Sequence, residues 1–176
     1  MSSKVLVIHP DDRSTDFLKL IYEGKDYDVI NRCSITDKEV RLAIKKHDKI
    51  IMMGHGIGSG LLNPKYGGLI INDSHADLLR EKETVSIWCF SDRYFRRNNI
   101  PGFHTGMIIS EVLEEMFMLG YAPLDKEELL NNMEYFATIV GECIEGSADW
   151  MKKYILNKYN DDDPVTEFNR NSIIVL

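Results

Sequence analysis

Short apolar runs alternate with amphipathic stretches over roughly the first two-thirds of the chain. Residues 4–9 (KVLVIH) and 50–53 (IIMM) are almost continuously apolar over the length of a strand, which is typical of strands buried on both faces of a parallel sheet. The strands expected on this basis are residues 4–9, 27–31, 50–53, 69–71, 85–88 and 172–176. Because helical patterns separate most of them, the sequence predicts a single α/β domain over residues 1–176, with three α/β/α layers and a mostly parallel sheet.

Helical periodicity fills the intervals between these strands. Residues 36–46 open with the capping-box pair Thr36 and Glu39 and place their apolar residues on one face. Thr105 is expected to open a helix whose apolar stripe runs from Ile108 to Phe117. The other expected helices are one capped by Thr15 or Asp16 and ended by Gly24, one capped by Ser74, and those over residues 91–99, 125–145 and 147–159, after which an acidic turn at 161–164 leads into the terminal strand.

The overall charge restricts the classes of partner. The formal net charge is −7 at pH 7, whereas broad affinity for nucleic acid or anionic lipid needs clustered Lys and Arg. One small basic cluster, Arg93, Arg96 and Arg97, is interpreted as a solvated helix face. We therefore expect no nucleic-acid partner and no membrane partner.

The cysteines and the start of the chain indicate a cytoplasmic protein. Cys33, Cys89 and Cys143 form a sparse, odd-numbered set, which is typical of reduced thiols, and their spacing gives no zinc-binding pattern. No apolar run approaches transmembrane length, and the opening residues (MSSK) lead into the first strand without the pattern of a signal peptide. The oligomeric state stays open.

The candidate chemistry lies at the ends of two predicted strands. Residues 50–53 end in Gly54-His55-Gly56, and residues 85–88 end in Cys89. Neighbouring parallel strands deliver their last residues to one edge of a sheet, so an imidazole and a thiol could meet there. A thiol and an imidazole are the smallest set of side chains that supplies a cysteine nucleophile with its base. On residue types alone the alternative is a flexible glycine turn beside a small buried hydrophobe.

The order of these segments resembles a known family. From Ile50 onward the chain contains, in order, IIMMGHG, GGLIIND, HADLLREK and VSIWCFS, followed by the stripe that Thr105 opens. This order is similar to the caspase-like cysteine peptidases, a group that includes caspases, metacaspases, gingipains, separase and bacterial CHAT proteases. The resemblance covers about residues 4–119 and implies a caspase-like α/β domain.

The resemblance also implies a role for each residue of the site. His55 would be the general base and Cys89 the nucleophile, with the backbone N–H groups of Gly56 and Cys89 forming the oxyanion hole. Such an enzyme would hydrolyse a peptide or protein substrate and would need no cofactor and no metal.

Substrate-binding residues are expected in the loop after the first strand and next to the nucleophile. Asp11, Asp12 and Arg13 occupy the first place and Asp92 the second. An acidic lining would select Lys or Arg beside the scissile bond, whereas Arg13 would favour an acidic side chain. The balance of charges leans toward the acidic lining.

Two alternatives to a peptidase remain. One is a catalytically inactive binding or regulatory module on the same scaffold, which a sulfur buried under Trp88, or one that points away from the histidine, would favour. The other follows from His9-Pro10-Asp11-Asp12, which is similar to the motif of the LmbE/PIG-L zinc deacetylases. There His9 and Asp12 would ligate zinc and Asp11 would be the base. Arg13 departs from that motif, and no His-x-x-His pair supplies the remaining ligand.

Overall fold

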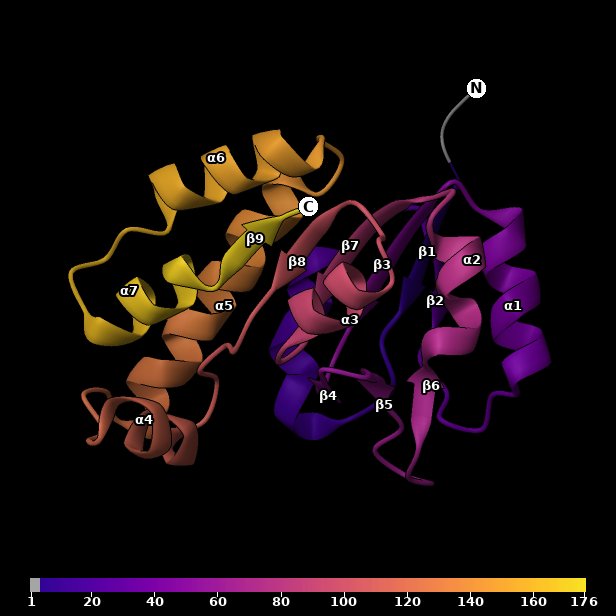
Figure 1. The fold of residues 1–176 in the computed structure, drawn as a ribbon. Coiled ribbons are helices and arrows are strands. Elements are labelled where there is room, and N and C mark those ends of the chain that lie inside the picture. Colours follow the sequence, from indigo (N-terminus) through magenta and orange to yellow (C-terminus); the bar gives the residue numbers. More distant parts are fainter. Residues whose placement is uncertain (1–3) are drawn as a thin grey trace.

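The main sheet has six strands in the order β2-β1-β3-β7-β8-β9 (Figure 1). The strands are β1 (Val5–Ile8), β2 (Asp28–Ile30), β3 (Lys49–Met53), β7 (Glu83–Ile87), β8 (Phe103–Thr105) and β9 (Ile173–Val175). Five run parallel, and β9 pairs antiparallel with β8 at one edge. The computed structural model describes residues 4–176, so the opening residues that bear on a signal peptide lie mostly outside the described part.

Helices cover both faces of this sheet, because its strands bury alternate side chains on opposite sides. In β3, Ile50 and Met52 belong to one apolar core, and Ile51 and Met53 belong to the other. The first core is covered by α1 (Asp37–Lys46), α2 (Ala76–Leu79) and α3 (Ser91–Arg97), and the second by η1 (Arg13–Ile21), α5 (Lys126–Cys143) and α6 (Ala148–Lys158). The predicted α/β class with a mostly parallel sheet is confirmed.

A second, small antiparallel sheet follows β3. Its strands are β4 (Gly56–Ile57), β5 (Gly60–Leu62) and β6 (Leu69–Ile71). It is joined to α2 through the short helix η2 (Asp73–His75), which Asn72 caps. In the sequence, this sheet therefore lies between β3 and β7, the two strands whose ends carry His55 and Cys89.

Several helix starts agree with the sequence. Thr36 and Glu39 form the expected capping box of α1, and Ser147 caps α6. The first helix differs, since the side chain of Asp12, not that of Thr15 or Asp16, caps η1. The arginines of α3 are tied to the protein surface by carboxylates and an aromatic ring: Arg93 lies over the Phe90 ring, Arg96 pairs with Asp92 and Arg97 pairs with Asp73.

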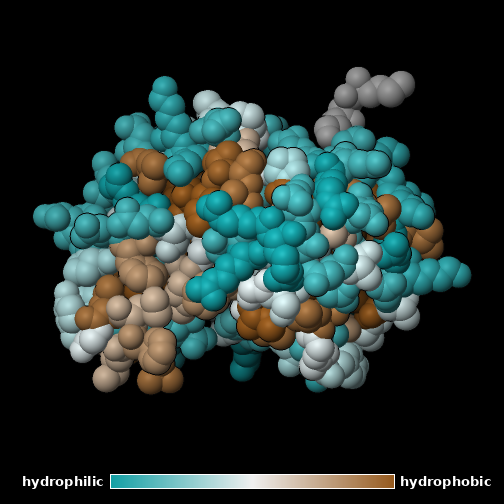
Figure 2. All heavy atoms as spheres, viewed as in Figure 1, coloured by the Kyte–Doolittle hydropathy of each residue, from teal (hydrophilic) through white to brown (hydrophobic). Residues whose placement is uncertain are grey.

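The expected helix from Thr105 was wrong. Thr105 ends β8, and the helix α4 spans only Val112–Leu119. The segment between them is irregular because Asn169 takes both backbone groups of Ile109: the Ile109 N–H donates to Asn169 Oδ1 (2.7 Å), and Asn169 Nδ2 donates to the Ile109 carbonyl (3.0 Å). Much of the predicted stripe is consequently exposed on α4, where Phe117 is 87% accessible. Figure 2 shows hydrophobic atoms at the surface in the region of α4, at the lower left.

The sequence reading also missed a helix. α7 (Pro164–Asn171) replaces the direct step from the acidic turn to β9. Asp163 accepts hydrogen bonds from the backbone N–H groups of Val165 and Thr166, and Pro164 occupies the first turn, where no N–H is needed. No helix within residues 4–176 is long and apolar enough to cross a membrane.

Candidate active site

His55 and Cys89 stand at matching positions on neighbouring strands. In the parallel register of β3 and β7, Met53 pairs with Ile87, and each candidate residue is the second one after its strand's last paired residue. The backbone N–H of Gly54 continues the pairing by donating to the Ile87 carbonyl (3.2 Å). The expectation that the sheet brings these two strand ends together is thus met by the geometry.

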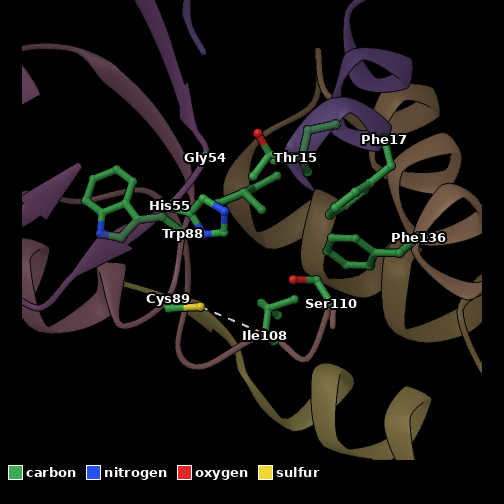
Figure 3. A pocket seen from close by; sticks show the side chains of 11 residues that line it. Thr15, Phe17, Gly54, His55, Trp88, Cys89, Ile108, Ser110 and Phe136 are labelled. Atoms are coloured by element: carbon green, nitrogen blue, oxygen red, sulfur yellow. Dashed lines mark hydrogen bonds between the residues drawn. The ribbon is translucent and has the colours of Figure 1, made fainter. Parts of the chain in front are cut away.

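One pocket is lined by both residues (Figure 3). Its other walls come from η1, from the segment between β8 and α4, and from α5. The lining residues are Thr15, Phe17, Leu18, Gly54, His55, Ile87, Trp88, Cys89, Ile108, Ser110 and Phe136. The pocket is therefore apolar apart from the imidazole, the thiol and two hydroxyls.

The Cys89 thiol is half-buried and protonated in this arrangement. Its S–H donates to the Ile108 carbonyl at 3.7 Å, and no hydrogen bond joins it to His55 in the described residues. Burial raises the pKa of the Cys89 thiol, and the carboxylates of Glu114 and Glu111 act in the same direction. The resting site thus holds a neutral thiol, not a thiolate–imidazolium pair.

The imidazole of His55 is held by Ser14. Its Nε2 lies 2.6 Å from the hydroxyl of Ser14, which in turn donates to Asp12 Oδ1 at 2.8 Å. Within residues 4–176, His55 Nδ1 makes no hydrogen bond. Neither Ser14 nor this connection was predicted, because Ser14, at the start of η1, is far from His55 in sequence.

The turn after β7 exposes a backbone donor beside the thiol. Phe90 adopts a left-handed conformation (φ 63°), which is costly for a residue other than glycine. Its N–H donates to Gly106, and the Thr105 hydroxyl donates to the Trp88 carbonyl. The Cys89 N–H, by contrast, donates to no other residue in the described part of the chain.

Trp88 does not cover the sulfur. Its indole is 2% accessible and packs in the core on the side of α1, α2 and α3, pointing away from the pocket (Figure 3). A Cβ atom added to Gly56 would lie 2.0 Å from Trp88 Cδ1, and Trp88 Nε1 donates to the Ile57 carbonyl. Gly56 is therefore required for packing against the indole, whatever its N–H contributes to a reaction.

The expected acidic substrate residues lie outside this pocket. Asp11 pairs with Lys19, Asp12 caps η1, and Asp92 pairs with Arg96. None of these carboxylates is among the residues that line the pocket. The side chains around Cys89 in this pocket are instead largely apolar.

Arg13 lines a neighbouring groove. This groove lies between η1, α4 and α5 and shares Phe17 and Ser110 with the pocket of Cys89. Its remaining lining residues are Ser14, Glu111, Val112, Leu113, Lys126, Leu129, Leu130 and Met133. Among the ion pairs of the described residues, none involves Arg13 or Lys126, so both cations are available at the groove.

The side chain of His9 forms hydrogen bonds within the protein. Both ring nitrogens of His9 are engaged, Nδ1 with the Tyr22 hydroxyl (3.0 Å) and Nε2 with the Thr15 hydroxyl (3.1 Å). Burial lowers the pKa of His9 to about 4, so the ring is neutral at pH 7. Nowhere in residues 4–176 do three His, Cys, Asp or Glu side chains gather in a way that could hold a metal ion. The geometry gives the zinc alternative no ligand set.

Comparison with known proteins gives no relative. The chain matches no model of a protein family, no curated protein and no solved structure. The interpretation of the pocket therefore rests on its own residues.

Proposed function

We propose that this protein is a cysteine peptidase, or a related thiol-dependent amide hydrolase of the caspase-like type, in which Cys89 is the nucleophile and His55 the base. The observation that carries the proposal is the placement of imidazole and thiol at matching ends of β3 and β7, in one pocket. The antiparallel ribbon between them and the helix α2 occur in the order that the resemblance predicts.

The reaction would begin with a turn of the Cys89 side chain. Rotation about its Cα–Cβ bond moves the S–H from the Ile108 carbonyl toward the unoccupied Nδ1 of His55, which accepts the proton. The thiolate then attacks the substrate carbonyl carbon, and the N–H groups of Cys89 and Gly56 stabilise the oxyanion. The imidazolium returns the proton to the leaving amine, and water hydrolyses the resulting thioester with His55 again as base.

The pocket lining favours an apolar side chain next to the scissile bond. Phe17, Leu18 and Phe136 form its walls, and a Lys or Arg side chain would enter it without a carboxylate partner. The neighbouring groove carries two cations, Arg13 and Lys126, against one carboxylate, Glu111. The substrate class we propose is therefore a peptide that combines an apolar residue at the cleavage site with acidic residues along the groove.

Hydrolysis of a fluorogenic peptide library tests this function. We expect the wild-type protein to cleave after Leu or Phe in peptides with flanking acidic residues, and Cys89→Ala and His55→Ala to lose cleavage by about 100-fold or more. Cys33→Ala removes another poorly accessible thiol outside the pocket and is the matched control. Cleavage that survives in Cys89→Ala would contradict the proposal.

The inactive binding module is the second candidate, because one observation favours it. The Cys89 thiol donates to a backbone carbonyl and burial raises its pKa, which is how a structural cysteine behaves. A module of this kind would bind the same acidic, apolar peptides without cleaving them. Binding by the wild-type protein and Cys89→Ala alike, with no product from either, would support this alternative against the peptidase.

A further inference from the structure

Three polar groups form a continuous chain behind the candidate base. His55 Nε2 lies 2.6 Å from Ser14 Oγ, and Ser14 Oγ lies 2.8 Å from Asp12 Oδ1. The backbone N–H of Ser14 donates to the same carboxylate oxygen at 3.0 Å. These bonds connect the loop after β1 to the strand end that carries His55.

The direction of each donor in this chain follows from Asp12. Hydrogen bonds from Ser14, chiefly from its backbone N–H, hold the pKa of Asp12 below its ordinary value, so the carboxylate is ionised at pH 7. An ionised carboxylate only accepts, so the single hydroxyl hydrogen of Ser14 points to Asp12. The Ser14 oxygen can then only accept from His55, and the proton of the neutral imidazole must be on Nε2.

From this geometry we propose that Asp12 and Ser14 are positioning residues, which fix His55 as the Nε2–H tautomer and leave the lone pair of Nδ1 as the base for Cys89. The inference rests on the proposed function for its catalytic meaning. The order is carboxylate, hydroxyl, imidazole and thiol, so the carboxylate acts on the histidine through a serine.

The start of η1 and its capping residue Asp12 are themselves anchored. Thr15 donates from its hydroxyl to the Asp12 carbonyl (3.2 Å) and accepts from His9 Nε2 (3.1 Å). The Tyr22 hydroxyl donates to the other ring nitrogen of His9, which is neutral because burial lowers its pKa. Buried beneath this segment, His9 thus holds Asp12 and Ser14 at the distance that His55 requires.

In the first step of this arrangement, one proton moves from Cys89 to His55. When Cys89 transfers its proton to Nδ1, His55 becomes an imidazolium with N–H groups on both nitrogens, and the Nε2–H stays on Ser14. Asp12 remains ionised and stabilises the new positive charge through Ser14, while the thiolate carries the negative charge. No proton leaves Ser14, so Ser14 is not a nucleophile in this scheme.

Nitrogen-15 NMR of the 176-residue chain tests the tautomer directly. Imidazole ¹⁵N shifts separate the two neutral tautomers, and a His55→Gln sample identifies the signals of His55 among those of the other histidines. We expect the Nε2–H form in the wild-type protein and a mixture of both forms in Ser14→Ala. Ser14→Thr keeps a hydroxyl and should restore the Nε2–H form.

The reaction rate supplies the second readout. With a peptide chloromethyl ketone ending in Leu, we expect Ser14→Ala to alkylate Cys89 about 10-fold more slowly than wild type at pH 7, and Ser14→Thr to recover most of that rate. Ser74→Ala is the matched control, since Ser74 also donates to an aspartate, Asp37, but contacts no site residue. Asp12→Asn keeps an acceptor for the helix cap and should fall between wild type and Ser14→Ala.

The outcomes separate this inference from the proposed function. An Nδ1–H tautomer in the wild-type protein, or an unchanged His55 tautomer in Ser14→Ala, overturns the positioning role. If the tautomer shifts as expected but the wild-type protein is not alkylated at Cys89, then the positioning geometry stands and the peptidase proposal fails. Labelling of Ser14 by a fluorophosphonate would overturn the positioning role in favour of a serine nucleophile.

Discussion

Cys89 is a neutral thiol in the structure, and the pH dependence of its alkylation rate tests this protonation state. Burial raises its pKa, so in a Cys33→Ala/Cys143→Ala background the rate of alkylation by iodoacetamide should be low at pH 7. It should keep rising with pH beyond the ordinary thiol pKa of about 8.5. A rate that reaches its plateau near pH 7 would reveal a preformed thiolate and contradict the buried, carbonyl-bonded sulfur.

The packing role of Gly56 follows from one distance, that between a Cβ at this position and the Trp88 ring. A Cβ at Gly56 would lie 2.0 Å from Trp88 Cδ1, so Gly56→Ala must displace a fully packed indole. We expect a loss of about 1–3 kcal/mol in the free energy of unfolding, measured by urea denaturation. In Gly106→Ala the nearest atom would lie 3.7 Å away, and this control should lose less. Equal losses would show that the indole contact is not the cause.

The position of the His55–Cys89 pair could be predicted from sequence, and its detailed contacts could not. Apolar runs locate the strand ends, and parallel register then sets them side by side. The direction of the thiol depends on the Ile108 carbonyl, and the orientation of the imidazole depends on Ser14. Ile108 lies on an irregular segment and Ser14 at the start of the short helix η1, and tertiary contacts that leave no periodic pattern in the sequence bring both to the site.

At the scale of elements, Asn169 decides where the chain between β8 and α4 stays irregular. It bonds both the N–H and the carbonyl of Ile109 in a buried setting. Asn169→Ala leaves two buried backbone groups without partners, and we expect a loss of about 2–4 kcal/mol in unfolding free energy. Asn171→Ala, at an exposed position in α7, is the control and should cost under about 0.5 kcal/mol. A similar cost for both would exclude this role.

Elements with strong local signals agree with prediction, and those governed by distant contacts do not. The buried strands and the Thr36 capping box of α1 follow from patterns within a few residues. The stripe from Ile108 to Phe117 satisfies helical periodicity, yet Ile108 and Ile109 are buried before α4 begins. The helix at Pro164 carried a readable signal, an Asp followed by Pro, which the interpretation as a turn overlooked.

At the scale of the whole molecule, buried neutral histidines tie stability to pH. Burial lowers the pKa of His9 to about 4 and that of His104 to about 3, against about 6.5 in an unfolded chain. The unfolded chain therefore binds more protons below pH 6.5, so stability is lost as the pH falls from about 6.5 toward 4 and 3.

Urea denaturation at a series of pH values checks this dependence. We expect the free energy of unfolding to fall steadily below pH 6.5 and His104→Gln to fall less steeply than wild type. His104 stacks on Phe95 and bonds Ser86, so the variant is judged by its slope and not by its absolute stability. A wild-type slope that the variant leaves unchanged would contradict a neutral His104.

The topology collects the candidate site from three distant segments. The loops after β3 and β7 contribute His55 and Cys89 at one edge of the sheet, and the start of η1, which follows β1, contributes Ser14. The strand order reverses around β1 and β3, which is where open α/β sheets bind ligands. The site therefore occupies the position at which this architecture forms a cleft.

The most direct test of the account is active-site labelling, read by intact mass and by peptide mapping. A chloromethyl ketone peptide with Leu at the reactive end is incubated with wild type, Cys89→Ala, His55→Ala and Cys33→Ala. The account predicts one adduct on Cys89 in wild type and Cys33→Ala, none in Cys89→Ala, and at least about 10-fold slower labelling in His55→Ala. Equal labelling of wild type, Cys89→Ala and His55→Ala would contradict it.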